Sequence, residues 1–285
     1  MIFRVAQISD THLSAEKPFF VRNFECVSRE LRIAAPDLVI NTGDVSLNGA
    51  AGIGDLHAAK ALHDTMGLSY RVIPGNHDVG DNVQSTHERG VSDARRDRFV
   101  AVFGDDWWVQ DVPGWRLVGV NSLIMDADLP AAARQFAFIA DAASGAGDRA
   151  VMLFIHKPLY LRSRHDRDPG GRYVSPSARA RLLQAFSTRP PAVIASGHVH
   201  QWRHVVLEGM QHVWAPATSF VMPPAHQVTI GERVVGYVEH RLHASGAFDC
   251  RIAKLPALIC NDLADFPGAY GDIARILPKL PTAGA

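Results

Sequence analysis

The first 200 residues alternate between short apolar runs and longer segments whose apolar residues recur with helical spacing. The apolar runs are rich in Val, Ile and Leu, and continuous runs of this kind are typical of strands buried in a parallel sheet. Strands are predicted over residues 3–9, 37–41, 70–73, 116–121, 150–155 and 192–195, and helices over residues 21–34, 56–66, 92–103, 131–143 and 176–186. This alternation predicts βαβ units, a mainly parallel sheet and therefore an α/β fold.

The pattern changes after His200. Four further runs are predicted to be strands of a meander, with turn signals at residues 208–209 and 245–246; the runs cover residues 202–207, 211–214, 233–242 and 247–254. From about residue 256 the chain is interrupted by Pro and Gly, and we expect its last part, residues 278–285, to be a loose tail. The sequence therefore predicts one domain over residues 1–255 and a C-terminal extension over residues 256–285, which would cap the domain or mediate oligomerisation.

The overall charge of the chain is balanced. Its 29 Lys and Arg residues equal its 29 Asp and Glu residues in number, so the formal net charge is zero. A balanced charge provides no electrostatic reason to expect a nucleic acid or an anionic membrane as the partner. Apolar residues make up 47% of the chain and charged residues 20%, which excludes a disordered protein and is enough to form a buried core.

Signals for export and for membrane insertion are not found. The first ten residues have the pattern of a strand, without the basic start and long apolar stretch of a secretory leader. No run reaches the roughly 18 apolar residues that predict a membrane-spanning helix. The three cysteines, Cys26, Cys250 and Cys260, are too few and too scattered for a disulfide framework. We therefore expect a cytoplasmic protein with reduced thiols and no membrane partner.

Five short polar clusters lie where predicted strands end and loops begin. They are Asp10-Thr11-His12, Gly43-Asp44, Gly75-Asn76-His77-Asp78, His156-Lys157-Pro158 and Gly197-His198-Val199-His200. In an extended segment, residues i and i+2 point to the same side, so the polar residues of D-x-H and of H-x-H are expected to converge in pairs. The carboxyl ends of parallel strands border one crevice, where all five clusters could meet. We expect the glycines to let the backbone turn sharply beside these residues.

The side chains of these clusters suit a transition metal. Carboxylate, imidazole and Asn carbonyl groups form a mixed oxygen and nitrogen donor set without thiolate, which suits Zn²⁺, Mn²⁺ or iron. Taken singly, each cluster could equally be a turn or a helix cap, because Gly, Asn and Asp favour turns. Together they hold more candidate ligands than one ion needs. A carboxylate shared by two ions about 3.5–4 Å apart would suit the in-line displacement of a phosphoryl group.

The ordered set D-x-H, G-D, G-N-H-D, H and G-H-x-H resembles the motifs of the calcineurin-like metallophosphoesterase superfamily. Every element is present, in order, from Asp10 to His200, which is about two-thirds of the chain. The segments S-D-T-H-L-S (9–14) and G-H-V-H-Q (197–201) are most similar to those of bacterial class III cyclic-nucleotide phosphodiesterases and glycerophosphodiesterases. The resemblance implies a four-layer αββα sandwich of two mixed sheets with flanking helices, with a dimetal site at the edge of the sheets.

The resemblance also implies which residues bind the two metal ions of each chain. One ion would be held by Asp10, His12 and His200, the other by Asn76, His156 and His198, and Asp44 would bridge them. The donor set does not choose among Mn, Fe and Zn, so the metal pair stays open.

The catalytic residues implied by the resemblance are Asp44 and His77. A hydroxide that bridges the two ions would attack phosphorus in line, while the ions neutralise the other phosphoryl oxygens. His77, as an imidazolium, would donate a proton to the departing alkoxide. Asp78 would orient a donor of the catalytic loop without touching the metals.

Two loops beside these motifs are candidates for substrate contacts. Residues 160–173 follow His156 and carry Arg162 and Arg164, whose guanidinium groups suit phosphate oxygens. The same composition suits a solvated flexible loop. Residues 79–90 follow the Asn76 cluster and carry His87. They would form either a mobile rim over the site or an ordinary surface loop.

These features predict a dinuclear-metal-dependent phosphoric ester hydrolase that acts on small-molecule phosphodiesters, of the cyclic-nucleotide or glycerophosphodiester type. A phosphomonoesterase or a phosphonate-ester hydrolase would use the same site, and a non-catalytic protein-binding scaffold is the alternative of another class. A nuclease is not favoured, because no basic stripe with interleaved aromatic residues appears. By analogy with the family, the segment from about Ala225 onward would mediate assembly into a homo-oligomer.

Overall fold

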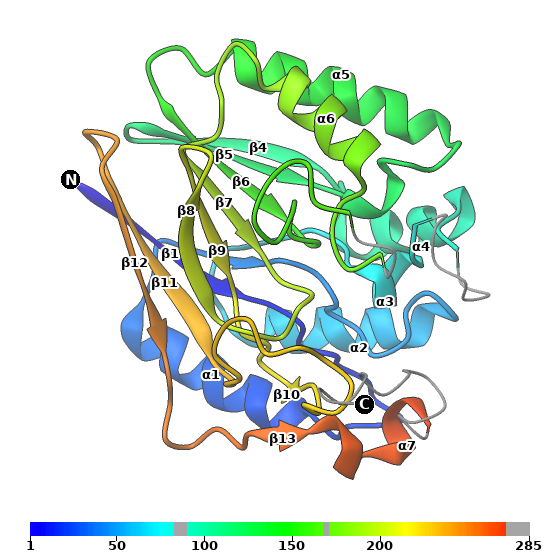
Figure 1. Ribbon diagram of the computed structural model, residues 1–285. Coiled ribbons are helices and arrows are strands. Elements are labelled where there is room, and N and C mark those ends of the chain that lie inside the picture. The colour runs from blue at the N-terminus through cyan, green and yellow to red at the C-terminus, as the bar shows by residue number, and fades with distance from the viewer. Residues whose placement is uncertain (83–89, 168–170, 272–285) are drawn as a thin grey trace, which may run out of the picture.

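The computed structural model describes residues 1–82, 90–167 and 171–271, and its strands form two large sheets (Figure 1). The first sheet has, in spatial order, β12 (Phe248–Ala253), β11 (Tyr237–His243), β1 (Ile2–Ile8), β2 (Leu38–Asn41) and β3 (Tyr70–Val72). The second has β4 (Trp108–Val112), β5 (Trp115–Val120), β6 (Ala150–Ile155), β7 (Val193–Ser196), β9 (Met210–Trp214) and β8 (Arg203–Leu207). Each sheet is therefore built from segments that are far apart in the sequence.

Both sheets are mixed. Strands β1, β2 and β3 pair in parallel, and β11 and β12 extend that sheet in antiparallel pairing. In the second sheet β5, β6, β7 and β9 are parallel, and the edge strands β4 and β8 are antiparallel to their neighbours. Parallel neighbours need a crossover connection, whereas a tight hairpin produces an antiparallel pair. The predicted parallel pairing thus holds for the centre of each sheet and not for the strands added by hairpins.

Helices cover the outer face of each sheet, so the chain forms four layers in the order αββα. The helices packed on the first sheet are α1 (Val21–Ala34), α2 (Ile53–Asp64) and α4 (Asp93–Phe103), and those on the second are α5 (Pro130–Ser144) and α6 (Pro176–Ala185) (Figure 1). Between the sheets, Val5 and Ile40 of the first sheet pack with Leu117 and Phe154 of the second. The four-layer sandwich of two mixed sheets predicted from the motifs is confirmed.

The helix ends follow local sequence signals. Helix α1 buries Phe24, Val27 and Leu31 on one face, at the spacing of an amphipathic helix, and its next residue, Ala35, has a left-handed backbone. Helix α5 begins at Pro130, one residue before the predicted range, and proline is favoured there because it has no N–H to leave unpaired. Local signals therefore account for the main helices without reference to the tertiary structure.

The predicted meander after His200 is wrong. Strands β8 and β9 form one hairpin in the second sheet, and β11 and β12 form another in the first. The turn signals predicted each hairpin correctly, because a tight turn depends on residues that are adjacent in the sequence. They contain no information on which sheet a hairpin joins. Strand β11 also begins at Tyr237, later than predicted, and β4 was not predicted as a strand.

The described part of the C-terminal segment packs beside the sheet edge. Strand β13 (Asn261–Asp262) pairs in parallel with β10 (Phe220–Val221), and it is followed by the 3-10 helix η2 (Leu263–Asp265) and helix α7 (Pro267–Tyr270). Two other short elements, α3 (Asn76–Val79) and the 3-10 helix η1 (Ser122–Ile124), follow β3 and β5. The domain boundary near residue 255 stays a prediction, and the predicted loose tail lies outside the described residues. In the described ranges, no helix is long and apolar enough to cross a bilayer.

Candidate metal centre

Seven polar side chains from five loops meet at one edge of the two sheets. Each loop follows a parallel strand, namely β1, β2 or β3 of the first sheet and β6 or β7 of the second. In that order the loops carry Asp10 and His12, Asp44, Asn76, His156, and finally His198 with His200. Because the carboxyl ends of parallel strands lie along the same edge, residues 190 positions apart in the sequence become neighbours.

The backbone at this edge is strained. The left-handed conformation costs a non-glycine residue on the order of 1–3 kcal/mol. Five of the seven residues adopt it, with φ of 51° at Asp10, 47° at His12, 51° at Asp44, 68° at His198 and 52° at His200. Among the non-glycine residues that the structure describes, only Ala35 and Glu208 also have a positive φ. Strain concentrated in this way indicates a functional site whose geometry the surrounding fold imposes.

The side chains of the D-x-H and H-x-H motifs converge for a different reason from the predicted one. The prediction assumed extended backbone, but β1 ends at Ile8, and both Asp10 and His12 are left-handed. Hydrogen bonds to the neighbouring loop hold this geometry, from the N–H of Asp10 to the carbonyl of Gly43 (2.9 Å) and from the N–H of His12 to that of Asp44 (3.0 Å). Two left-handed residues, rather than the pleat of a strand, aim the side chains at one point.

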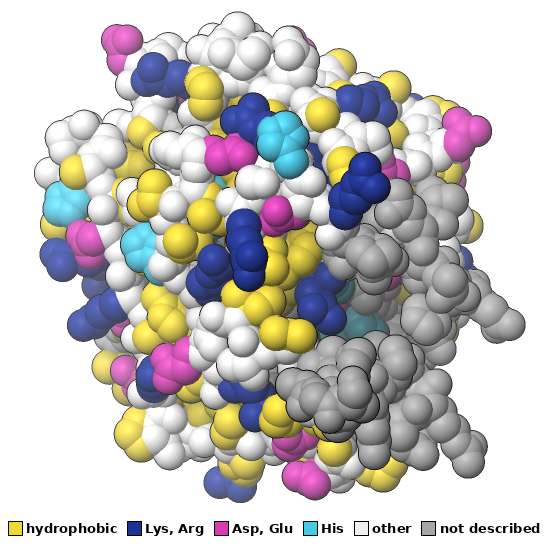
Figure 2. All heavy atoms as spheres, in the orientation of Figure 1, with side chains coloured by type: hydrophobic (Ala, Val, Ile, Leu, Met, Phe, Trp, Pro, Cys, Tyr) yellow, Lys and Arg dark blue, Asp and Glu magenta, His cyan; other side chains and the backbone are white. Residues whose placement is uncertain are grey.

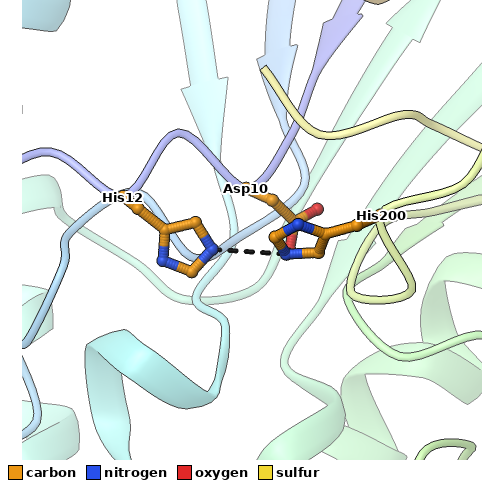
Figure 3. Close-up of side chains that lie close together, drawn as sticks. All are labelled: Asp10, His12 and His200. Carbon is orange, nitrogen blue, oxygen red and sulfur yellow. Dashed lines mark hydrogen bonds and ion pairs between the residues drawn. The ribbon is translucent and has the colours of Figure 1, made fainter. Parts of the chain in front are cut away.

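One group of converging atoms belongs to Asp10, His12 and His200 (Figure 3). Nε2 of His200 lies 3.3 Å from Oδ1 of Asp10 and 3.4 Å from Nε2 of His12. All three side chains are buried. The three donor atoms therefore surround a single position.

A second group consists of Asp44, Asn76, His156 and His198. Nε2 of His156 lies 3.2 Å from Oδ1 of Asn76, 3.2 Å from Nδ1 of His198 and 3.4 Å from Oδ2 of Asp44. The same Oδ2 of Asp44 lies 3.9 Å from Nε2 of His12 in the first group. Asp44 is thus placed between the two groups.

Hydrogen bonds determine which ring nitrogens face the centre as acceptors. The Nδ1 atom of His156 lies 2.8 Å from the carbonyl of Thr42, and that of His200 lies 2.8 Å from the carbonyl of Phe220. A carbonyl can only accept, so each Nδ1 carries a proton, and in the neutral ring each Nε2 presents a lone pair to the centre. Lone pairs and carboxylates that converge without a hydrogen between them form a donor set for cations. The residues present therefore fit metal ions in both groups.

The pKa shifts of the buried side chains also indicate a site for positive charge. Burial alone would disfavour an imidazolium at His156, yet Asp44 and then Asp10 raise the pKa of His156 to about 9. Burial also opposes the ionisation of Asp44, but His156 and His77 hold the pKa of Asp44 well below its usual range. By contrast, burial lowers the pKa of His12 and of His198 well below the ordinary histidine value. The buried carboxylates therefore require positive charge in contact with them, which either a proton or a metal ion can supply.

Two glycines are needed here because of close approach. A Cβ atom at Gly75 would lie 2.1 Å from Oδ1 of Asp44, and one at Gly197 would lie 1.9 Å from Oγ of Ser9 and 2.6 Å from Oδ2 of Asp10. The sharp turn predicted for all three motif glycines is found at Gly43, with φ of 102°. At Gly75 and Gly197 the prediction named the wrong cause, because the missing side chain makes room for a carboxylate.

Asp78 joins two of the loops. Its carboxylate accepts hydrogen bonds from the N–H of Gly75 (2.8 Å) and from the N–H of Val45 (3.1 Å), the residue after Asp44. It also accepts from the N–H and the hydroxyl of Ser46, at 2.9 and 2.6 Å. Burial, followed by the charge of Asp44, raises the pKa of Asp78 to about 7. This arrangement is compatible with the orienting role that the sequence predicted for Asp78.

A polar chain beneath the site orients Asp10. The hydroxyl of Ser9 donates to Oδ2 of Asp10 (2.6 Å) and accepts from the hydroxyl of Thr42 (2.8 Å). Thr42 accepts from the amide of Gln7 (3.0 Å), which also bonds the carbonyl of Ser196 in the second sheet (3.2 Å). The carboxylate of Asp10 is therefore fixed by groups from both sheets.

His77 lies next to both groups of candidate ligands. Its backbone N–H donates to Oδ1 of Asp44 (2.8 Å), and its ring centre lies 4.9 Å from that of His12. The ring is partly buried, and its Nδ1 lies 3.2 Å from the carbonyl of Leu47. The sequence prediction of a catalytic imidazole beside the metals is compatible with this position.

The two arginines predicted to contact the substrate are not bonded to the candidate ligands. Arg164 pairs with Glu208, at 2.6 Å, and Arg162 is exposed. Within the described ranges, no hydrogen bond or ion pair joins either guanidinium group to the candidate ligands. His87 lies outside the described residues, as do residues 83–89 as a whole. On the face drawn in Figure 2, basic and acidic side chains are interspersed, and no uniformly basic stripe is seen there.

One residue at the centre was not predicted. Oη of Tyr270, in α7, lies 2.5 Å from Nδ1 of His12, and its ring centre lies 4.8 Å from that of His77. The sequence around Tyr270 is a Pro- and Gly-rich segment without a motif. The pairing of β13 with β10 and the apolar packing of the C-terminal segment bring it to the site, so no local signal could have identified it.

Comparison with known proteins gives a consistent picture. Residues 3–202 match the model of the calcineurin-like phosphoesterase family, a range that includes all seven candidate ligands. A probable glycerophosphodiester phosphodiesterase, GpdQ, of Arcobacter nitrofigilis is 24% identical over 243 residues, which cover 80% of this chain and 81% of that protein.

Solved structures share the fold at low sequence identity. GAP50, the anchor in the inner membrane complex of Plasmodium, has a TM-score of 0.62 at 13% identity, covering 89% of this chain and 84% of that one. A dimetal phosphatase from Danio rerio has a TM-score of 0.56 at 12% identity, covering 84% and 92%. At these identities the likeness shows the fold alone.

Proposed function

The chain belongs to the calcineurin-like phosphoesterase family, and we propose that it hydrolyses phosphodiesters of small molecules at a centre of two metal ions. The observation that carries this proposal is that two groups of converging donor atoms meet at one carboxylate, because Oδ2 of Asp44 lies 3.4 Å from Nε2 of His156 and 3.9 Å from Nε2 of His12. Two groups that share a ligand can hold two ions close enough to act on one phosphoryl group.

The proposed ligands follow from these two groups. Asp10, His12 and His200 hold one ion, Asn76, His156 and His198 hold the other, and Asp44 contacts both. His156 and His200 are already held with Nε2 as the acceptor, so they need no change of tautomer to bind a metal. When bound, the ions supply an activated water and neutralise charge on the phosphoryl oxygens.

The charge of such a centre suits a small anion. Two divalent ions together with Asp10 and Asp44 leave a charge of about +2 at one place, in a chain whose formal net charge is zero. A phosphodiester is attracted to this point without a basic surface around it. A long polyanion would gain little from the rest of the face in Figure 2, where charges of both signs are mixed.

His77 is proposed as the proton donor for the leaving group. A diester of glycerol or a cyclic nucleotide releases an alkoxide, which is a poor leaving group until it is protonated. The ring of His77 lies beside His12 and is anchored through Nδ1 to the carbonyl of Leu47, so Nε2 is the atom left to carry the proton.

The choice of a diester rests on the relative. GpdQ of Arcobacter nitrofigilis bears the name of a glycerophosphodiester phosphodiesterase, and the match covers four-fifths of both chains. A phosphomonoesterase or phosphonate-ester hydrolase would use the same metal centre, because the metals interact with the phosphoryl group and not with its substituents. The two classes are therefore separated by activity and not by the ligands.

The test compares substrates under one metal loading. The protein is freed of metal with EDTA, reloaded with Mn²⁺, and assayed on glycerophosphodiesters, cyclic nucleotides, phosphomonoesters and phosphonate esters. We expect about two ions per chain and higher kcat/KM for diesters. Faster turnover of monoesters or phosphonate esters would overturn the diester proposal and leave the metal centre intact.

A non-catalytic scaffold is the second candidate, and one observation favours it. The same fold occurs in GAP50, the anchor in the inner membrane complex of Plasmodium. Metal content distinguishes the candidates. A chain that binds no Mn²⁺ or Zn²⁺ and hydrolyses none of the four substrate classes after loading would contradict the enzyme proposal and support the scaffold.

A further inference from the structure

The C-terminal segment is anchored beside the metal centre by apolar packing. Leu263 and Ala269 are buried against Phe20, Leu47 and Phe220, and Phe266 and Tyr270 pack on the same group. The pairing of β13 with β10 adds a backbone connection at Phe220. Phe220 is also the residue whose carbonyl bonds His200. The segment and the centre therefore share a structural element.

Within this segment Tyr270 contacts the centre itself. Its hydroxyl oxygen lies 2.5 Å from Nδ1 of His12, the nitrogen on the far side of the ring from Asp10 and His200. Its ring meets that of His12 edge-on, with 5.8 Å between the ring centres, and lies against His77. A contact of this length is a hydrogen bond whose direction depends on the tautomer of His12.

Three histidines of the centre share one pattern. Each turns Nε2 toward the converging donors and has Nδ1 in a hydrogen bond: His156 with the carbonyl of Thr42, His200 with that of Phe220, and His12 with the hydroxyl of Tyr270. In the first two, the partner belongs to the backbone of the sheet edge. In the third, it is a side chain 258 positions further along the chain.

We propose that Tyr270 is a positioning residue of the metal centre, and that the C-terminal segment thereby completes the ion site formed by Asp10, His12 and His200. The hydroxyl of Tyr270 accepts the Nδ1 proton of His12, so that Nε2 keeps its lone pair for the ion. This inference rests on the proposed function, because it assumes that His12 is a metal ligand. It assigns to the C-terminal segment a task within the same chain.

The opposite direction of the hydrogen bond has the opposite consequence. If the tyrosine hydroxyl donated to Nδ1, the proton of His12 would lie on Nε2 and would point at the site of the ion. Removal of the hydroxyl would then tighten metal binding. The sign of the change therefore reports the direction of the bond.

The test is Tyr270→Phe, which keeps the ring against His77 and removes only the hydroxyl. Isothermal titration of the metal-free protein with Mn²⁺ should give two binding events in the wild type. In the variant we expect one of them to weaken by about 10- to 100-fold, the range found when a partner of a metal-bound histidine is lost, and the other to stay unchanged. The absorption spectrum of the Co²⁺-loaded protein should change for one ion only.

Two further variants isolate the effect. Tyr237→Phe removes another buried tyrosine hydroxyl, which bonds Glu239. Tyr237 packs on the helix-covered face of the first sheet, so the affinity for both ions should stay unchanged. His12→Ala should weaken the same ion as Tyr270→Phe, and the double variant should bind it no more weakly than His12→Ala alone, because the two residues act through one ligand.

The remaining outcomes decide against the proposal. The positioning role would be overturned if Tyr270→Phe bound both ions with wild-type affinity, bound an ion more tightly, or bound both ions equally more weakly. Each of these outcomes would leave the proposed metal centre standing. A wild-type protein that binds no metal would instead overturn the proposed function, and this inference with it.

Discussion

Nζ of Lys157, the residue after His156, lies 2.5 Å from Oδ1 of Asp81, so a buried ammonium group links the loop after β6 to the loop after α3. The same ammonium donates to the carbonyl of Gly171 (2.6 Å). The side chain of Lys157 is 1% exposed, whereas that of Asp81 is 23% exposed. One side chain thus ties together three segments around the candidate metal centre.

Lys157→Met is therefore expected to destabilise the protein. The change leaves the Asp81 carboxylate and the Gly171 carbonyl without their donor, which should lower the free energy of unfolding by about 2–3 kcal/mol. Lys60→Met is the control, because Lys60 forms an exposed ion pair with Asp64 on one helix, and its loss should cost about 0.5 kcal/mol or less. Urea unfolding of the metal-free proteins measures both. Equal losses in the two variants would contradict the structural role of Lys157.

Asp78→Asn should displace the carboxylate of Asp44, which we propose contacts both ions. An amide retains one acceptor oxygen and turns an N–H₂ group toward the N–H donors of the Asp44 and Asn76 loops, so at least one hydrogen bond becomes a repulsive contact. We expect kcat/KM to fall by about 10- to 100-fold, together with metal content. Asp64→Asn, at an exposed carboxylate far from the loops, serves as the control. Unchanged metal affinity in Asp78→Asn would show that Asp44 keeps its place without this bond.

His77→Ala should discriminate between leaving groups. Loss of the proposed proton donor is expected to slow hydrolysis of an alkyl diester by about 10²–10⁴-fold. A p-nitrophenyl diester leaves without protonation and should be affected much less. Steady-state kinetics on both substrates at one metal loading measure the ratio. A variant that slows both substrates by the same factor is evidence against proton donation and for a role in shaping the site, since His77 also holds Asp44 through its backbone.

Acid should weaken the fold through a buried histidine outside the centre. Burial, with a smaller contribution from Arg203, lowers the pKa of His212 to about 4, against about 6.5 in the unfolded chain. The unfolded state therefore binds this proton at a higher pH, and stability falls as the pH drops from about 6.5 toward 4. His212→Leu removes the titrating imidazole and with it this contribution to the pH dependence of stability. Between pH 6.5 and 4.5 the variant should lose about 2 kcal/mol less than the wild type in urea unfolding with EDTA present. If the two proteins lost the same free energy of unfolding over this pH range, the predicted contribution of His212 would be refuted.

Much of the candidate site was predictable from the sequence. Asp10, Asp44 and His156 each stand within a few residues of a strand end, and the strands themselves are visible as apolar runs. The order of the short motifs carried the resemblance to the calcineurin-like metallophosphoesterases, and that resemblance implied the αββα sandwich. The sequence therefore predicted which residues would meet and in which kind of fold.

The sequence did not predict how these residues meet. Asp10 and His12 converge because both have a left-handed backbone, and hydrogen bonds that their N–H groups donate to the loop after β2 offset the strain. Gly75 and Gly197 are required by side chains from other loops, which no pattern around the glycines contains. Such contacts join positions that are distant in the sequence, so they become visible only with the coordinates.

Tyr270 marks the limit most clearly. The sequence by itself determined most of the central strands and the seven polar residues, because local periodicity and short motifs determine local structure, and the resemblance carried by those motifs supplied the four layers. Only the tertiary structure decided that two hairpins join different sheets and that a tyrosine from the last described helix reaches His12. The physical reason is that the pairing of β13 with β10 and the packing of the C-terminal segment depend on surfaces formed by the rest of the chain, not on the residues next to them.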